Sequence, residues 1–384
     1  MAKRTLVLVL VLVLALWLVP AVRAAEESAP VSLTAASALL MEPQSGQVIW
    51  EKNADERRPV ASVTKIMAIL LACEAVEQGR CSLDDVVNVS KQASGMGGSQ
   101  VLLDTGEQQP FRLLLKSMIV ASANDATVAV GEYLYGSERA FVARMNQRAQ
   151  ELGLENTHFA NSTGLPAQDH YTTARDVAMM SRELVKHPLY FEFSTIWMDT
   201  LDHGDGRVTQ LTNTNRLTRL YDGCDGIKTG STNEAGYCMS ASAVRGDMRL
   251  IAVVLASKSS SARFSDAQAL LDYGFANYRT YTAAQKGARV KGAMPVTGGE
   301  RDSLALELGE DLTLLIAKGE EQAVELVPRL PQWVPAPIYK GQQVGTLEVQ
   351  LGGRLLGQVP VVASEAVARN GFLDGWQRVL DHWF

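Results

Sequence analysis

A serine and a lysine three residues apart are the first candidates for chemistry in this sequence. Ser62 and Lys65 open an apolar, proline-free stretch that predicts a helix over residues 62–77. Three residues are nearly one helical turn, so both side chains face the same side. A partly desolvated lysine with a lowered pKa can remove the proton of a serine hydroxyl, and N–H groups at a helix start can stabilise an oxyanion. Such a tetrapeptide also arises about once by chance in a chain of this length, with the serine as an N-cap and the lysine solvated.

Two further sequence elements argue against a chance occurrence of this tetrapeptide. Ser122 and Asn124 supply a second hydroxyl and an amide 60 residues later, in a stretch that predicts a helix over 111–133. Lys228, Thr229 and Gly230 stand on a predicted strand that precedes a turn and another strand. A substrate can lie along such a strand edge while the lysine holds a carboxylate.

The three elements together resemble those of the penicillin-recognising serine enzymes, in which S-x-x-K, S-x-N and K-T-G recur in this order. The surrounding residues are similar to those of the low-molecular-mass penicillin-binding proteins, the serine-type D-alanyl-D-alanine carboxypeptidases. The matching segments are Ser122-Ala123-Asn124-Asp125-Ala126, Phe159-Ala160-Asn161-Ser162-Thr163-Gly164-Leu165, Thr172-Thr173-Ala174-Arg175-Asp176 and Asp225-Gly226-Ile227-Lys228-Thr229-Gly230. The resemblance covers nearly the whole chain after its first 24 residues.

The resemblance implies a role for each reacting residue. Ser62 attacks the carbonyl between the two terminal D-alanines of a peptidoglycan stem peptide and forms an acyl-enzyme. Lys65 takes the serine proton, and Ser122 relays a proton to the leaving D-alanine nitrogen. Asn124 orients Lys65 and the substrate amide. Water then releases the shortened peptide, and β-lactam antibiotics are expected to acylate the same serine.

The resemblance also implies the residues that bind substrate. Lys228 and Thr229 hold the terminal carboxylate, with Gly230 beside them, and Arg263 assists in carboxylate recognition. The backbone N–H groups of Ser62 and Ser231 form the oxyanion hole. His170 resembles a family histidine without a catalytic assignment. The mechanism requires no cofactor and no metal.

Other functions compete with this interpretation. A serine β-lactamase is a distant alternative, because Ala123 replaces the aspartate of the S-D-N element and no Glu-x-x-x-Asn element is found. A catalytically silent wall protein that only binds penicillin-like ligands has no need for Lys65. A third alternative gives the main function to the second half of the chain, as an adaptor for another wall enzyme.

The elements that must position these residues predict an α/β (α+β) domain over 30–281, with an antiparallel sheet and helices, similar to the DD-peptidase/β-lactamase-like domain. Residues 285–365 are rich in Gly, Val and Pro, alternate in short apolar runs, and predict a small all-β domain. The elements expected in the first domain are strands on both sides of the turn 43–47, helices over 62–77, 111–133, 137–152 and 264–275, and strands over 236–244 and 249–256.

The two ends of the chain carry signals of location. Residues 1–24 combine a basic start, an apolar run and a small residue at a cleavage point, which is typical of a signal peptide, an uncleaved anchor being the alternative. Residues 367–384 predict an amphipathic helix with two tryptophans on its apolar face. This helix either lies on a membrane surface or docks on the all-β domain. We therefore expect an exported protein, peripheral to the outer face of the cytoplasmic membrane.

Composition excludes several other functions. The 384 residues carry a formal net charge of −6, or −9 once residues 1–24 and their three cations are removed, and no dense basic cluster that would bind nucleic acid. The five histidines show no zinc-ligand spacing. Of the four cysteines, Cys73 with Cys81 and Cys224 with Cys238 are conceivable disulfides, although isolated buried thiols are preferred.

Overall fold

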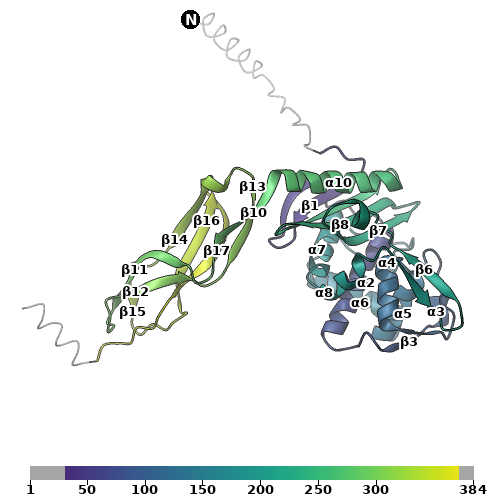
Figure 1. Ribbon diagram of the computed structural model, residues 1–384, viewed down its shortest axis with the longest axis horizontal. Helices are drawn as coiled ribbons and strands as arrows, with labels where there is room; N and C mark the ends of the chain where they lie inside the picture. Colours follow the sequence, from purple (N-terminus) through teal and green to yellow (C-terminus); the bar gives the residue numbers. More distant parts are fainter. Residues whose placement is uncertain (1–30, 372–384) are drawn as a thin grey trace, which may run out of the picture. The chain divides into compact units, whose positions relative to one another are not determined.

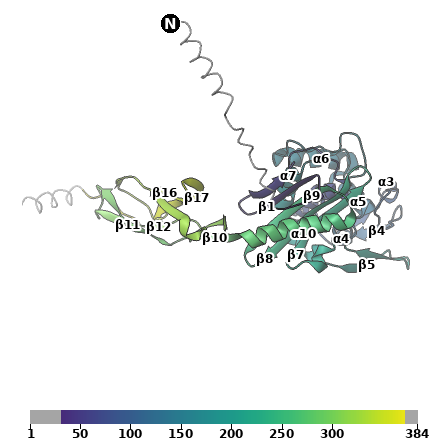
Figure 2. The same cartoon turned by 90° about the horizontal axis from the view of Figure 1, so that it is seen from above.

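A five-stranded antiparallel sheet forms the centre of the α/β domain in the computed structural model, which describes residues 31–371. Helix α10 (Ser260–Asn277) covers one face of this sheet and α7 (Ala174–Leu184) lies against the other (Figures 1 and 2). The central strands are buried almost throughout, as expected for a sheet covered on both faces. In spatial order the strands are β2 (Gln47–Lys52), β1 (Ser37–Glu42), β9 (Met248–Ser257), β8 (Gly236–Arg245) and β7 (Cys224–Thr232).

Helix α2 (Lys65–Glu77) runs through the core of this domain and confirms the helix expected over 62–77. Its residues from Lys65 to Ala75 are buried without interruption, because other helices surround it. The first turn of the expected helix is a separate 3-10 turn, η1 (Ala61–Thr64), which carries Ser62. The candidate serine therefore precedes the α-helix that carries the candidate lysine.

The prediction of a single helix over 111–133 is wrong, because the structure has two helices there. Helix α4 (Phe111–Val120) ends before Ser122, and α5 (Asn124–Tyr135) begins after it. Ser122 has a φ of +62°, in the left-handed region that a residue with a Cβ rarely adopts. Apolar residues continue at helical spacing on both sides of the break, so the sequence pattern did not reveal it. The break lies at one of the candidate catalytic residues, where backbone strain is often found.

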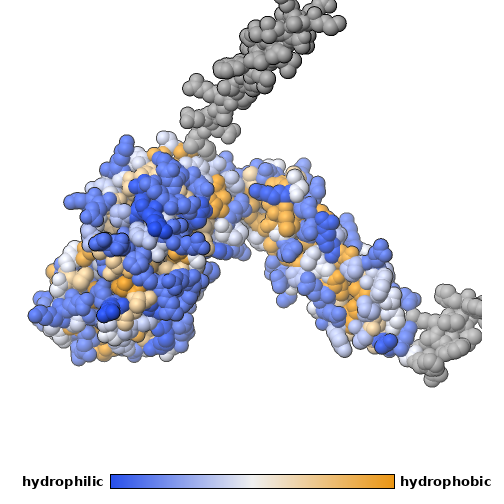
Figure 3. All heavy atoms as spheres, turned by 180° about the vertical axis from the view of Figure 1, so that it is seen from behind, coloured by the Kyte–Doolittle hydropathy of each residue, from blue (hydrophilic) through white to orange (hydrophobic). Residues whose placement is uncertain are grey.

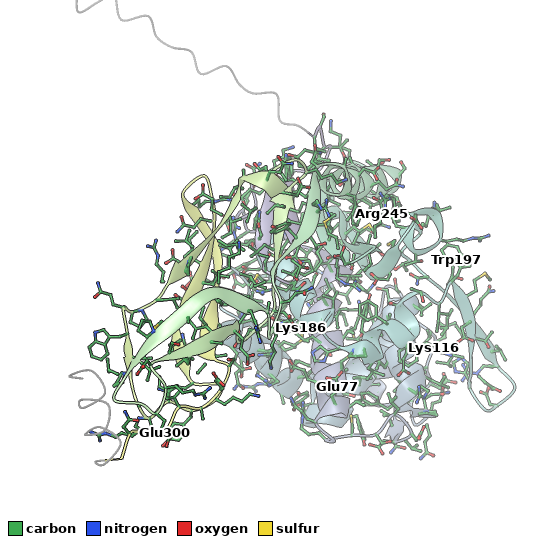
Figure 4. The ribbon with its side chains drawn as sticks, turned by 60° about the vertical axis from the view of Figure 1, so that its left-hand side comes forward. Glu77, Lys116, Lys186, Trp197, Arg245 and Glu300 are labelled. Atoms are coloured by element: carbon green, nitrogen blue, oxygen red, sulfur yellow. The ribbon has the colours of Figure 1, made fainter. Side chains whose placement is uncertain are left out.

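The remaining elements of the α/β domain are short or peripheral. Two two-stranded antiparallel sheets, β3 with β4 and β5 with β6, lie outside the central sheet. Lys116 of α4 forms an ion pair of 2.5 Å with Asp199 of β5 (Lys116 is labelled in Figure 4). The short and peripheral elements of the α/β domain are β3 (Val86–Asn88), α3 (Lys91–Ser94), β4 (Gln108–Pro110), α6 (Glu138–Glu151), α8 (Pro188–Ser194), β5 (Met198–Asp202), β6 (Val208–Thr212) and α9 (Leu217–Leu220).

The all-β part begins at Tyr278, seven residues before the expected boundary at 285. Strand β10 (Tyr278–Ala284) pairs with β13 (Leu312–Ala317), so residues 278–281 belong to the all-β module and not to the α/β domain. A six-stranded sheet completes the module around its own apolar core. Its strands, in spatial order, are β14 (Val324–Arg329), β16 (Gln343–Leu351), β17 (Arg354–Ala363), β12 (Ser303–Leu308), β11 (Arg289–Thr297) and β15 (Val334–Pro335), with a 3-10 turn η2 (Glu321–Ala323) before β14.

The prediction of a helix over 367–384 is wrong for its first five residues, 367–371. Val367 pairs with Ile338 and Arg369 with Gly299 in antiparallel bridges, so these residues complete the module in an extended form. Residues 372–384 lie outside the described residues, as does the expected signal peptide 1–24. Within residues 31–371, no helix is both long enough and apolar enough to cross a membrane.

The four cysteines are free thiols, which confirms the preferred interpretation and excludes both conceivable disulfides from this structure. All four are buried. Burial raises the pKa of the Cys224 thiol to about 12 and that of Cys238 to about 11, so both remain protonated and unreactive at neutral pH.

The all-β module exposes several large apolar side chains. Figure 3 shows a band of hydrophobic residues along the face of the module drawn there. The large apolar side chains of the module that are exposed are Leu326, Trp333, Tyr339 and Leu355. Trp333 and Tyr339 belong to the connection between β14 and β16, which also contains β15 and the bridge from Ile338 to Val367.

Candidate active site

The turn that carries Ser62 is held tightly against strand β7. Ala61, which precedes the serine, has a φ of +49°. A Cβ atom on Gly230 would come within 2.6 Å of the carbonyl oxygen of Val60 and 2.8 Å of the backbone nitrogen of Ser62. Only glycine allows this approach, which explains the small residue after Lys228 and Thr229. The third sequence element thus fixes the position of the first.

Lys65 is completely buried, and its amine lies 2.8 Å from the hydroxyl oxygen of Ser62. The amine also donates to the carbonyl oxygen of Thr163 at 2.8 Å. Burial lowers the pKa of Lys65 well below its ordinary value, and the nearby positive charge of Lys228 lowers it further, while Asp125 acts in the opposite direction. A neutral amine within hydrogen-bond distance of a hydroxyl is suited to take its proton.

The loop that supplies the Thr163 carbonyl is fastened to the turn of Ser62 at two points. Gly164 has a φ of +83°, and a Cβ there would lie 1.9 Å from the carbonyl oxygen of Ala61. The second point is His170, whose Nε2 lies 2.7 Å from Thr64 Oγ1. The Nδ1 of His170 accepts from the backbone N–H of Ala160 at 3.1 Å, so a neutral ring carries its proton on Nε2 and donates it to Thr64. Burial lowers the pKa of His170 to about 4, which keeps the ring neutral.

Ser122 and Asn124 each present a buried oxygen that is not satisfied. Within residues 31–371, Ser122 Oγ and Asn124 Oδ1 have no hydrogen-bond partner. The amide nitrogen of Asn124 donates to the carbonyl oxygen of Gly97 at 2.6 Å, which leaves its oxygen to face the site. Buried polar atoms without a partner carry a desolvation cost, and a bound substrate that supplies partners would remove it.

Lys228 is also almost completely buried, at 1% exposure, but its environment differs from that of Lys65. Its amine contacts the carbonyl oxygen of Thr229 at 3.3 Å. Burial lowers the pKa of Lys228 to about 7, and the charge of Arg263 contributes. Arg263 is buried too and donates to the carbonyl oxygen of Gly230 at 3.1 Å, while the hydroxyl of Thr229 donates to Thr214 at 2.8 Å. Two buried cationic side chains, Lys228 of β7 and Arg263 of α10, thus lie at the strand that carries the third element.

A cavity of about 350 Å³ opens in front of these groups. It is lined by Ala61, Ser62, Gly98, Ser99, Asn124, Thr163, Gly164, Leu165, Ser231 and Thr232. The structure therefore brings Ser62, Asn124 and Ser231 to one cavity and buries Lys65, Ser122, Lys228, Thr229 and Arg263. A larger cavity of about 590 Å³ lies in the all-β module, far along the sequence from every residue of the three elements.

Several residues of the site were not assigned from the sequence. Thr163 acts through its carbonyl oxygen, which any residue could supply, so its identity carried no signal. Asp125 was within a matching segment and His170 was noted as similar to a family histidine, but nothing in their spacing revealed their partners. Gly98 and Ser99 belong to a loop whose Gly97-Gly98 pair is the only local sign of a close approach. Among residues 31–371, no group of three or more His, Cys, Asp or Glu side chains is arranged to hold a metal ion.

A half-buried serine whose hydroxyl contacts a buried lysine at the start of a helix, on a turn held against an antiparallel sheet, is the arrangement of serine hydrolases that use lysine in place of histidine. Comparison with known proteins identifies the group within this class. The family model of S11 peptidases, described as D-alanyl-D-alanine carboxypeptidase, matches residues 23–259, and that of the penicillin-binding protein 5 C-terminal domain matches residues 278–369. The chain belongs to the family of serine-type D-alanyl-D-alanine carboxypeptidases.

Individual relatives support this assignment over most of the chain. The D-alanyl-D-alanine carboxypeptidase DacF of Bacillus subtilis is 40% identical over 91% of this chain and 90% of its own length. The structure of penicillin-binding protein 5 from Haemophilus influenzae has a TM-score of 0.78 at 30% identity and covers 88% of this chain and 99% of its own. The Streptomyces K15 DD-transpeptidase structure has a TM-score of 0.59 at 32% identity and covers 64% of this chain and 98% of its own. The fold class expected from the sequence is thereby confirmed.

Proposed function

We propose that this protein removes the terminal D-alanine from peptidoglycan stem peptides through an acyl-enzyme on Ser62. The observation that carries the proposal is the 2.8 Å contact between the hydroxyl of Ser62 and the completely buried amine of Lys65. Such a lysine has no role in a protein that only binds its ligand, since a buried amine is costly to maintain. Family membership supports the same reaction class.

In the first half of the reaction, Lys65 takes the proton of Ser62 as the serine oxygen attacks the carbonyl between the two D-alanines. The N–H groups of Ser62 and Ser231 stabilise the oxyanion, and Ser122 passes a proton to the nitrogen of the departing D-alanine. Asn124 accepts a hydrogen bond from the substrate amide with its unpaired oxygen. In the second half, water attacks the ester, the shortened peptide leaves, and Ser62 regains its proton.

Recognition of the terminal carboxylate explains why the enzyme acts at the end of a peptide. Lys228, Thr229 and Arg263 lie together along or behind strand β7. A substrate carboxylate would give Lys228 the charged partner that it lacks, because its contact within residues 31–371 is the carbonyl oxygen of Thr229. β-Lactams combine a reactive amide with a carboxylate, so they are expected to acylate Ser62 in the same position.

The test is the mass of the intact protein after incubation with benzylpenicillin, beside a Ser62→Ala variant. We expect a stable penicilloyl adduct that the variant does not form, together with release of D-alanine from stem peptides by the wild type alone. Absence of an adduct with intact drug would favour a catalytically silent binding protein. Absence of an adduct with hydrolysed drug would favour a β-lactamase.

We further propose that the protein is exported and works at the outer face of the cytoplasmic membrane, attached through residues 372–384. The composition of residues 1–24 and the tryptophan-bearing stripe of residues 372–384 support this location. Exposed Trp333 and Tyr339 lie on the connection that is bridged to Val367, and aromatic side chains favour the interfacial region of a bilayer. Sedimentation with lipid vesicles, with and without residues 372–384, tests the attachment.

A further inference from the structure

We infer that Asp125 is a positioning residue for the acyl-transfer reaction, because its carboxylate holds the loop 97–103 that in turn orients Asn124. The inference rests on the proposed function and adds a residue that acts on the reaction without touching the substrate.

Asp125 is a completely buried carboxylate at the start of α5. Its oxygens accept hydrogen bonds from the backbone nitrogen of Val101, at 3.2 and 3.0 Å, and from that of Leu103 at 3.2 Å. Within residues 31–371, no cation lies at ion-pair distance from it. Charge-assisted hydrogen bonds from backbone N–H groups therefore offset the free-energy cost of burying this carboxylate.

The same loop contacts the active site through residues that precede Val101 in the sequence. The carbonyl oxygen of Gly97 accepts from the side-chain amide of Asn124 at 2.6 Å, and that of Ser99 accepts from its backbone nitrogen at 2.7 Å. Gly98 and Ser99 line the cavity. One short segment thus connects the Asp125 carboxylate to the orientation of the Asn124 amide and to the wall of the substrate cavity.

The charge of Asp125 also acts on the general base. The charged groups that act on Lys65 are Lys228 from β7, which lowers its pKa, and Asp125 from α5, which raises it. Removing the negative charge should make the protonated form of Lys65 less stable, so its pKa falls. The neutral, reactive form of Lys65 would then persist to lower pH.

Two substitutions separate the positioning effect from the charge effect. Asp125→Asn keeps the shape, removes the charge and presents an NH₂ group to a backbone N–H, while Asp125→Glu keeps the charge and displaces the loop. Asp84→Asn is the matched control, because Asp84 is an exposed carboxylate of the same α/β domain. The readout is the acylation rate by benzylpenicillin between pH 5 and pH 9, with thermal unfolding of each variant measured in parallel.

We expect both Asp125 variants to acylate roughly tenfold to a hundredfold more slowly at their optimum, the loss typical of a misplaced active-site group. The acid limb of the pH profile should move to lower pH in Asp125→Asn and stay in place in Asp125→Glu. Wild-type acylation in the same series reports on the proposed function separately. If both variants keep the wild-type rate and pH profile and lose only thermal stability, Asp125 is structural and the inference is overturned.

Should Asp125→Asn fail to fold, Asp125→Glu decides alone: a folded variant with an undiminished acylation rate contradicts the inference.

Discussion

The regions around Lys65 and Lys228 bury a lysine equally well but satisfy it differently. Lys65 lies between two oxygen atoms, Ser62 Oγ and the Thr163 carbonyl oxygen, each at 2.8 Å. Lys228 has a longer contact, at 3.3 Å, with the carbonyl oxygen of the next residue. Lys65 has its hydrogen-bond partners before substrate binds, whereas Lys228 gains a charged partner when a carboxylate binds. The difference separates a base that works through a low pKa from a cation that works through its charge.

The strongest test of this comparison is removal of the base. Lys65→Ala should lower the acylation rate by benzylpenicillin on the order of 10³-fold, because the Lys65 amine is the group that lies at hydrogen-bond distance from the serine hydroxyl. Intact-protein mass against time measures the rate. Lys186→Ala is the matched control, since Lys186 is exposed and forms an ion pair with Glu183 of the same turn (Lys186 is labelled in Figure 4). A variant that lost affinity for the drug but acylated at the wild-type maximal rate would assign Lys65 to binding instead.

Removal of the second lysine should cost less and depend on the ligand. Lys228→Gln should slow acylation by benzylpenicillin on the order of 10²-fold, the value of a buried charged hydrogen bond to a carboxylate. The same substitution should change acylation by the methyl ester of benzylpenicillin much less, because the ester carries no negative charge. Rates for both compounds on both proteins give the coupling directly. Equal losses for the acid and the ester would mean that Lys228 does not hold the carboxylate.

The pH dependence should distinguish the two lysines without removing either. Lys228 has a pKa of about 7, so it is charged below that pH and loses its charge as the pH rises. Acylation by a carboxylate-bearing drug should therefore decline on the alkaline side. Arg263→Gln removes a neighbouring positive charge, which should raise the pKa of Lys228 and move this alkaline limb to higher pH, even though the maximum falls. A limb that stays in place would assign it to another group.

A smaller effect is expected at the loop that holds the Thr163 carbonyl. His170 has a pKa of about 4 in the folded protein and near 6.5 when unfolded, so the unfolded chain binds a proton first as the pH falls. Stability should decline between about pH 6.5 and pH 4, by up to about 3 kcal/mol, and His170→Gln should remove that decline. Urea denaturation at pH 7 and pH 4.5 measures it. An unchanged acid sensitivity in His170→Gln would contradict the expectation.

The sequence allowed the elements to be predicted better than their junctions. Apolar periodicity is continuous within α2, β8 and β9, and these were confirmed. The break at Ser122 escaped, since it depends on a backbone conformation and not on polarity. The start of the module at Tyr278 depends on pairing with β13, more than 30 residues away. For the same reason the extended form of Val367 and Arg369 was missed: their bridges connect to residues 338 and 299.

In the active site, too, side chains with distinctive chemistry could be predicted from the sequence, whereas contacts made by the backbone could not. Ser62, Lys65, Asn124 and Lys228 are chemically distinctive and could be proposed from their spacing. The contributions of Thr163, Gly97 and Ser99 are made by backbone carbonyl oxygens, which leave no trace in residue type. Asp125 is distinctive, but only the structure shows which N–H groups it binds.

The smallest effect on chemistry should follow from the largest deletion. Every residue of the proposed site lies before α10 ends at Asn277, and the all-β module has its own core. The Streptomyces structure, 98% of which aligns with 64% of this chain, indicates that the catalytic fold can exist without such a module. A protein of residues 25–277 should hydrolyse soluble stem peptides with kcat/KM within about threefold of the full chain, as expected for an independent domain, and should no longer sediment with lipid vesicles. A folded truncation that lost activity more than tenfold would instead make the module part of the catalytic unit.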